Sequence, residues 1–123
     1  MVGMPVRAIR GATTLDADER EHLHGRTQEL VDALMSANGL VPDDVISVLF
    51  TCTPDIVSDF PAAAARDQGF GAVPLMCAQE MAVAGSLPRV VRVLMHVDTA
   101  RERADITHVY LHGAVALRRD LAQ

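Results

Sequence analysis

The chain has 123 residues, of which half are hydrophobic and 22% are charged, a balance typical of a folded globular protein rather than a disordered one. The net charge is −5 and only 3% of the residues are aromatic. The sequence therefore offers neither a basic patch for phosphates nor an aromatic platform for bases, and we exclude nucleic acid as a partner.

No apolar run reaches the roughly 18 residues that a membrane-spanning helix needs, and charges interrupt the stretch where a signal peptide would be apolar. We therefore expect a cytoplasmic protein with no membrane partner. The two cysteines, Cys52 and Cys77, are too few for a secreted disulfide framework. No repeat or linker interrupts the chain, so we expect a single domain over residues 1–123, small enough that association would help to stabilise it.

The first predicted elements are a strand over 6–11 and a long helix after it. Asp16 is placed to cap the helix, and Glu19 occupies the capping-box position. An apolar stripe at helical spacing follows, and Asn38-Gly39 supplies the left-handed residue that commonly ends a helix. The stripe consists of Leu23, Leu30, Val31, Leu34 and Met35.

The middle of the chain predicts two strands separated by a short helix. Residues 45–52 form a nearly continuous run of β-branched and apolar side chains, typical of a strand covered on both faces. Phe60-Pro61 opens an alanine-rich helix that ends at Arg66, with proline in its first turn. Residues 72–77 predict the next strand.

The last part of the chain predicts a strand over 89–97 and a closing hairpin that joins 108–111 to 115–118. Period-2 spacing in the first of these strands places one set of side chains in the core: Val91, Val93, Met95 and Val97. Strands outnumber helices and alternate with them only in part. The sequence therefore predicts an α+β fold, a mixed β-sheet with one long helix and short helical turns.

Several polar residues are candidates for chemistry. Arg92 lies in mid-strand, where a guanidinium is costly to bury unless an anion meets it. Arg10 precedes a glycine turn and could bind a carboxylate through paired hydrogen bonds. Glu80 follows Cys77 by three residues, and Tyr110 is the single tyrosine. Taken alone, each residue is at least as well explained as an exposed charge, a structural ion pair, a buried thiol or a half-buried phenol.

Metal and nucleotide sites have little support. His108, Tyr110 and His112 share one face of a predicted strand, but no carboxylate or cysteine completes a ligand set at suitable spacing. The sequence contains neither a P-loop nor a G-x-G-x-x-G motif. We therefore expect no metal and no cofactor.

A series of short motifs carries a family resemblance. They are Arg-Gly-Ala-Thr-Thr at 10–14, Thr-Pro-Asp at 53–55, Phe-Pro-Ala at 60–62, Pro74, Cys77, Gln-Glu-Met at 79–81, Arg92-Val93, His-Val-Tyr-Leu at 108–111 and Leu117-Arg118. In this order and spacing, over almost the whole chain, the sequence resembles the monofunctional chorismate mutases of the trimeric mixed α/β class, the AroH class, as opposed to the all-helical class.

The resemblance implies an isomerase that converts chorismate to prephenate in the biosynthesis of phenylalanine and tyrosine. It also implies a homotrimeric pseudo-α/β-barrel with one active site in each cleft between adjacent subunits, and no cofactor. The positions that match the principal site residues of the family are Arg10, Glu80, Arg92 and Tyr110. Those that match further site residues are Cys77, Phe60, Arg66, Leu117 and Arg118.

The roles that the resemblance implies suit these residue types. The reaction is an intramolecular Claisen rearrangement, so the enzyme holds a dianion in its compact conformer and stabilises developing charge. Arg92 would oppose the negative charge at the ether oxygen, and Glu80, with Cys77 nearby, would accept a hydrogen bond from the ring hydroxyl. Arg10 and Tyr110 would hold the enolpyruvyl carboxylate. The apolar walls would be Phe60 and Leu117.

Some positions depart from the family pattern. Ala63 stands where the family often has lysine, Ala82 where it often has aspartate, and Arg119 where proline follows Leu-Arg. The family's Gly pair is here Gly85-Ser86. The missing lysine leaves a substrate carboxylate to be neutralised by other cations, for which the candidates are Arg66, Arg118 and Arg119.

Two alternatives from other classes compete with this interpretation. One is a catalytically silent trimeric module that binds a small carboxylate through Arg10 and Arg66, although carboxylate binding alone would not require Arg92 and Glu80. The other is a cofactor-free enzyme with Cys77 as nucleophile and His96 or His108 as base.

Overall fold

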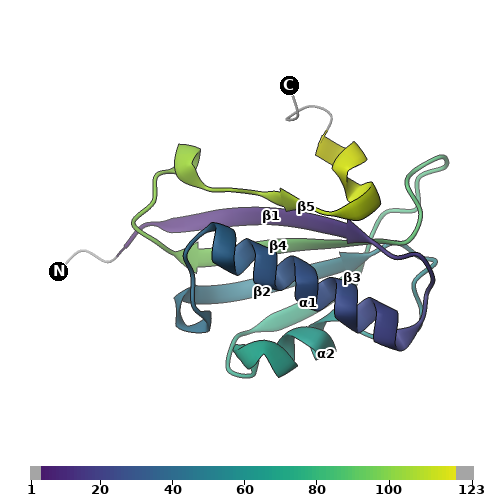
Figure 1. The fold of residues 1–123 in the computed structure, drawn as a ribbon, viewed down its shortest axis with the longest axis horizontal. Helices are drawn as coiled ribbons and strands as arrows, with labels where there is room; N and C mark the ends of the chain where they lie inside the picture. The colour runs from purple at the N-terminus through teal and green to yellow at the C-terminus, as the bar shows by residue number, and fades with distance from the viewer. Residues whose placement is uncertain (1–3, 119–123) are drawn as a thin grey trace.

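The computed structural model describes residues 4–118 and shows a five-stranded mixed sheet with its α-helices on one face (Figure 1). The strand order is β3-β2-β4-β1-β5. The strands are β1 (Val6–Thr14), β2 (Val45–Cys52), β3 (Leu75–Gln79), β4 (Val90–Asp98) and β5 (Val109–Tyr110). The helices are α1 (Arg20–Ala37) and α2 (Pro61–Ala65), with helical turns η1 (Pro42–Asp44), η2 (Arg66–Phe70), η3 (Arg103–Asp105) and η4 (His112–Arg118). The predicted α+β class is confirmed.

Strand directions make the sheet mixed. The central strand β4 runs antiparallel to both of its neighbours, β1 and β2. The edge strands β3 and β5 run parallel to β2 and β1, respectively. Because parallel strands cannot be joined by a tight hairpin, the chain crosses from β2 to β3 through α2 and η2.

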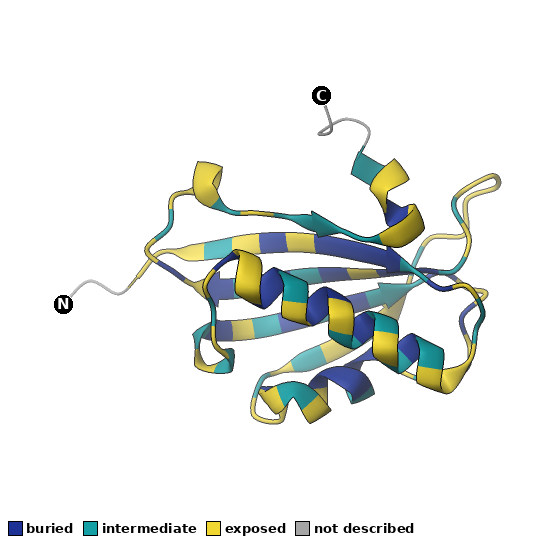
Figure 2. Cartoon of the chain, viewed as in Figure 1, coloured by how far each residue is buried: buried dark blue, intermediate teal, exposed yellow. Residues whose placement is uncertain are grey.

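One face of the sheet forms the core with α1. The period-2 prediction for β4 is confirmed, since Val91, Val93, Met95 and Val97 are at most 3% exposed. The predicted apolar stripe of α1 is also buried, and Figure 2 shows these buried residues alternating with exposed ones along the helix. Burial of this shared apolar surface is the main stabilising contribution to the fold.

We call the other surface of the sheet the open face. Its residues include Arg10, Leu49, Thr51, Arg92, Leu94 and His96. Within residues 4–118, η4 packs on one end of this face. There Ala114 is fully buried and forms a small second core with Ala12 and Val90. The remaining part of the face carries exposed and half-buried side chains.

Several predicted boundaries agree with the structure. The strand over 45–52 is confirmed to the residue, and α2 begins at Pro61 as expected. Gly39, with φ of 63°, follows the last residues of α1 in the left-handed conformation. The other strands differ in extent from the prediction. β1 continues to Thr14 and β3 covers Leu75–Gln79 rather than 72–77. β4 covers Val90–Asp98 rather than 89–97, and β5 covers Val109–Tyr110 rather than 108–111.

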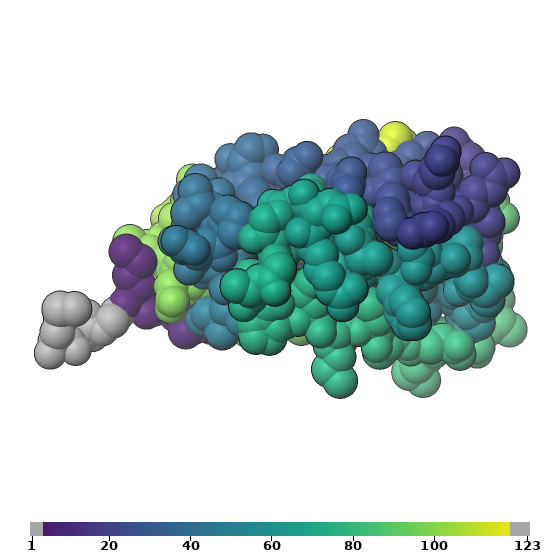
Figure 3. All heavy atoms as spheres, turned by 90° about the horizontal axis from the view of Figure 1, so that it is seen from below, coloured from purple at the N-terminus to yellow at the C-terminus, as the bar shows by residue number. Residues whose placement is uncertain are grey.

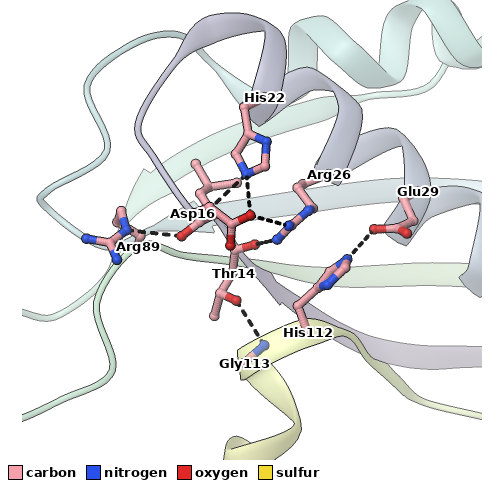
Figure 4. Close-up of polar contacts among 9 residues, drawn as sticks. Thr14, Asp16, His22, Arg26, Glu29, Arg89, His112 and Gly113 are labelled. Atoms are coloured by element: carbon pink, nitrogen blue, oxygen red, sulfur yellow. Dashed lines mark hydrogen bonds and ion pairs between the residues drawn. The ribbon is translucent and has the colours of Figure 1, made fainter.

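The predicted N-terminal cap of α1 is wrong. The helix begins at Arg20, and the capping residue Glu19 makes no hydrogen bond through its side chain. The Asp16 carboxylate instead pairs with Arg26 at 2.9 Å, and the Asp16 N–H donates to Nε2 of His22 at 3.0 Å (Figure 4). Asp16 therefore holds the segment before α1 against the helix, through bonds to His22 and Arg26 of α1.

The predicted closing hairpin is also wrong, because residues 115–118 belong to η4 and not to a strand. His112 has φ of 52°, which turns the chain off the line of β5. Its ring contacts the Glu29 carboxylate at 2.7 Å, and the next N–H, of Gly113, donates to the Thr14 hydroxyl at 3.0 Å (Figure 4). These bonds direct the chain onto the open face instead of back along β5.

The two helices form one continuous outer surface. The Gln28 side chain of α1 donates to the carbonyl of Ala64 at 3.2 Å, and the Gln68 side chain donates back to the carbonyl of Gln28 at 3.0 Å. Seen from below, α1 and the segment from α2 to β3 lie against each other (Figure 3). These bonds join α1 to the segment that crosses from β2 to β3.

Candidate active site

The register of the central strands brings the charged candidates into neighbouring rows on the open face. Arg10 of β1 lies opposite Leu94 of β4, which lies opposite Leu49 of β2. In the next row, Arg92 of β4 lies opposite Thr51 of β2. Two residues predicted from separate parts of the chain, Arg10 and Arg92, are thus adjacent in space.

Arg92 pairs with Glu80. Its Nε lies 3.1 Å from Oε1 of Glu80, and the Thr51 hydroxyl donates to the same oxygen at 2.5 Å. The Glu80 N–H donates to the carbonyl of Cys52 at 2.8 Å, which extends the parallel ladder just past the end of β3. Arg92 is 45% exposed and Glu80 is 22% exposed, so the pair can still be reached by a ligand.

Two cavities meet at Arg92. The first, of about 240 Å³, is lined by Arg10, Thr51, Arg92 and Tyr110 together with apolar residues that include Leu49 and Leu94. The second, of about 360 Å³, is lined by Glu80, Arg92 and Leu117 among others. Five of the predicted site residues therefore line these two cavities, which share Arg92: Arg10, Glu80, Arg92, Tyr110 and Leu117.

Arg118 joins this group through Tyr110. Its guanidinium carbon lies 5.0 Å from the centre of the Tyr110 ring, in cation–π contact. Its Nη1 donates to the carbonyl of His108 at 3.2 Å. The Nε of Arg118 is buried without a hydrogen-bond partner among the described residues. Arg119 lies outside the described residues.

Phe60 and Cys77 belong to a different part of the molecule. Cys77 lies opposite Phe50 in the β2–β3 register, and Phe50 is a core residue, so the thiol is on the helix-covered face. Both predicted residues line a cavity of about 430 Å³ that also contains Cys52. Phe60 is 68% exposed. Arg66, at the start of η2, is exposed and lines none of these three cavities.

This placement contradicts the cysteine-nucleophile alternative. Its two proposed bases, His96 and His108, line a fourth cavity together with Arg7 and Arg103, whereas Cys77 lies on the opposite face of the sheet. The other thiol is also unsuited to attack, because burial raises the pKa of Cys52 to about 12.

Sequence reasoning missed Thr51 and the two leucines of the open face. The strand that carries Leu49 and Thr51 was expected to be covered on both faces, but in the described chain these side chains line a cavity. The alternation along β2 could have indicated this site, since Thr51 interrupts the apolar run on the face of the strand opposite to Phe50. Half-buried leucines beside charged residues mark a surface that gains from further burial.

Two further properties concern residues 4–118 as a whole. No three of their histidine, cysteine, aspartate and glutamate side chains gather in a way that could hold a metal ion. None of their helices has the length and apolar character required to cross a bilayer.

Comparison with known proteins gives a family. The model of chorismate mutase type I matches residues 6–121. The chain belongs to that family. The chain is 48% identical over 119 residues to chorismate mutase AroH of Thermus thermophilus, an alignment that covers 94% of this chain and 96% of the relative. It is 42% identical over 120 residues to chorismate mutase AroH of Bacillus subtilis, covering 97% and 94%.

The fold agrees with this assignment. The chorismate mutase from Clostridium thermocellum matches the structure with a TM-score of 0.88 and 45% sequence identity, over 89% of this chain and 98% of that one. The family resemblance drawn from the sequence motifs is therefore confirmed.

Proposed function

We propose that this chorismate mutase converts chorismate to prephenate on the open face, with Arg92 and Glu80 as its central pair. The observation that carries the proposal is their ion pair, which stands where the cavity lined by Arg10 and Tyr110 meets the cavity lined by Leu117. The arrangement offers one fixed cation and one fixed anion side by side, with further cations around them.

This charge pattern matches the needs of the reaction. In the rearrangement the ether C–O bond breaks while a C–C bond forms within the same molecule, so no proton, electron or added group is transferred. Negative charge grows on the ether oxygen and partial positive charge on the ring. Arg92 stabilises the first and Glu80 the second, and because both are held in place before the reaction, little reorganisation opposes the step.

The geometry of the pair leaves Arg92 able to bind substrate. Its Nε faces Glu80, so the two terminal nitrogens can bind the ether oxygen while the ion pair persists. Thr51 holds Oε1 of Glu80 from the other side, which leaves the second carboxylate oxygen for the ring hydroxyl. Thr51 is thus a positioning residue for Glu80.

The remaining residues hold the two carboxylates and select the compact conformer. Arg10 and Tyr110 line the cavity on one side of Arg92 and would bind the enolpyruvyl carboxylate. Arg118, whose guanidinium lies over the Tyr110 ring, is the candidate for the second carboxylate, in place of the lysine that Ala63 replaces. Holding both ends converts a rare conformer into the bound one.

Cys77 would contribute through its backbone. The carbonyl of Pro74 and the N–H of Glu80 both bond to β2. Alternation along a parallel strand then points the backbone groups of Cys77 toward the free edge of β3, beside Glu80. An edge N–H there can donate to the substrate, whereas the thiol packs into the core.

A homotrimer would bring the two groups of residues together. Phe60 and Arg66 are exposed on a different part of the chain from Arg10 and Arg92, and the open face carries half-buried Leu94. If the open face of one copy meets the Phe60 region of the next, Phe60 forms an apolar wall and Arg66 adds a cation to a shared site. Excluding water in this way strengthens every electrostatic contact in the site.

A direct assay tests the proposal against the carboxylate-binding alternative. Purified protein in the presence of a chelator is incubated with chorismate, and the loss of chorismate and formation of prephenate are followed. Conversion far above the uncatalysed rate is the expected result. Binding of chorismate without conversion would support the silent module instead.

We also propose that the protein acts in the cytoplasm. Cys52 and Cys77 are both free thiols, and the reducing conditions of that compartment keep thiols in this state.

A further inference from the structure

An imidazole completes the backbone ladder beneath the site. In the parallel pairing of β1 and β5, Gly11 lies opposite Val109, and the Leu111 N–H donates to the carbonyl of Ala12 at 2.9 Å. The regular pattern would give the Arg10 N–H the carbonyl of Thr107 as its acceptor. The Arg10 N–H instead donates to Nδ1 of His108 at 3.0 Å.

The carbonyl of Thr107 is directed elsewhere by Asn38. The Asn38 side chain, 2% exposed at the end of α1, donates to that carbonyl at 2.9 Å and accepts from the Thr107 N–H at 2.8 Å. The chain before β5 is therefore anchored to the helix, and the ring of His108 replaces the missing ladder acceptor for β1.

His108 is also bonded to the other end of the candidate site. Its carbonyl accepts the hydrogen bond from Arg118, whose guanidinium lies over the Tyr110 ring. One residue thus contacts Arg10 through its ring and Arg118 through its backbone. These are two of the cations assigned above to the substrate carboxylates.

The bond to Arg10 specifies the chemical state of the ring. Nδ1 accepts, so the imidazole must be neutral with its proton on Nε2. Two charged groups face His108, and both are cationic: Arg10 of β1 and Arg118 of η4. The cavity beside the ring is also lined by Arg7, by His96 of β4 and by Arg103 of η3. None of the described residues that line this cavity is acidic, and Glu102 pairs with Arg7 at 3.5 Å.

These surroundings oppose protonation. Burial, reinforced by the charges of Arg10 and Arg118, lowers the pKa of His108 from its ordinary value of 6.5. Protonation would place a donor on Nδ1 against the Arg10 N–H and add a third positive charge. The folded protein therefore keeps the neutral ring below pH 6.5, where an unfolded chain would bind a proton, and this residue's contribution to stability falls as the pH drops below 6.5.

We propose that neutral His108 is a positioning residue for the reaction, which sets the places of Arg10 and Arg118 at the carboxylate-binding end of the site. The inference rests on the proposed function, because it assigns those two cations to substrate carboxylates. Its effect should appear in KM more than in kcat, since Arg92 and Glu80 do not contact the ring.

Two variants separate the acceptor from the ring. His108→Asn keeps an acceptor near the position of Nδ1 but cannot be protonated there, and His108→Leu removes the acceptor at similar size. We expect His108→Leu to raise KM about tenfold, which corresponds to about 1.4 kcal/mol, with a much smaller change in kcat. His108→Asn should retain most of the wild-type KM.

The pH profile adds a reading that a merely structural role would not give. For the wild type, kcat/KM should be flat through neutrality and past pH 6.5, then fall through a rise in KM at lower pH as the ring is protonated. In His108→Asn this step in KM should disappear. A wild-type step in KM that remains in His108→Asn would overturn the inference.

Magnetic resonance tests the same claim in the wild type, without any variant. Nitrogen–proton correlations of the ring at pH 7 should show the Nε2–H tautomer, and exchange of the Arg10 amide hydrogen should be slow. A protonated Nδ1 at pH 7 would overturn the role of His108 but not the proposed function. The same holds if the wild type is active and His108→Leu leaves KM unchanged. A wild type that forms no prephenate removes the proposed function itself.

Discussion

The two faces of one strand, β4, differ in nearly every property. Val93 and Met95 point to the helix-covered face and are buried, whereas Arg92 and Leu94, their immediate neighbours, point to the open face and remain partly accessible. The covered face is made of apolar side chains that α1 completes within the chain. The open face mixes a charge pair with half-buried leucines.

The difference separates the residues that stabilise the fold from those of the candidate site. The side chains of β4 on the covered face are buried inside the chain, so they should matter for folding. Within residues 4–118 the open face keeps an ion pair and apolar surface partly exposed, so its residues should matter for substrate and for a second copy of the chain.

The largest effect should come from separating the copies. Met76 lies on the open face in the same row as Leu49, and a charge there would oppose burial against another subunit. We expect Met76→Glu to give folded monomers that have lost activity, because the proposed shared clefts would no longer form. Val41→Glu, at an exposed position before η1, is the matched control and should change neither property. Light scattering coupled to the assay decides the matter, and an active monomer would count against shared sites.

Loss of the central cation should have the next largest effect. We expect Arg92→Ala to lower kcat by at least ~10²-fold, by analogy with the removal of one preorganised oxyanion donor, ~2.7–4 kcal/mol. Its free energy of unfolding should stay near that of the wild type, since the side chain is nearly half exposed. Arg20→Ala on α1 is the control and should retain turnover. Turnover near the wild-type rate in Arg92→Ala would refute the role given to this arginine.

The covered face should show the reverse pattern. Met95→Ala removes a fully buried side chain and should lower the free energy of unfolding by about 2–5 kcal/mol. Leu94→Ala, one residue earlier on the open face, should cost about 1 kcal/mol or less in the separated chain. Denaturant titration of both variants makes the comparison. Equal losses would mean that the two faces are not divided as described.

The smallest effect is expected at Cys77. Because its thiol lies on the covered face, Cys77→Ser should keep substantial activity, and a thiol reagent should not inactivate the enzyme by blocking a nucleophile. Kinetics of the variant and of the treated wild type measure this. Collapse of turnover in Cys77→Ser, with the fold intact, would restore the cysteine mechanism.

Much of the fold could be predicted because its signals are local. The alternation along β4 and the apolar stripe of α1 depend only on spacing within one element, and both hold. The cap at Asp16 and the final hairpin failed for a different reason. Arg26 competes for the Asp16 carboxylate, and Thr14 and Glu29 capture the turn at His112, which are contacts that no local pattern contains.

The candidate site shows the same division. Arg10, Glu80, Arg92 and Tyr110 were expected together from the family resemblance, and the cavities bring them to one region. The hydrogen bonds from Thr51 to Glu80 and from Arg10 to His108 could not be predicted, because they depend on strand register and on where Asn38 anchors the chain.

The most direct test is a structure of the protein with a stable analogue of the folded, transition-state-like conformer. The account predicts that the terminal nitrogens of Arg92 contact the ether-oxygen position and that Glu80 contacts the ring hydroxyl from the adjacent cavity. A bound analogue that leaves Arg92 turned away into solvent, with Glu80 remote from the ligand, would contradict it.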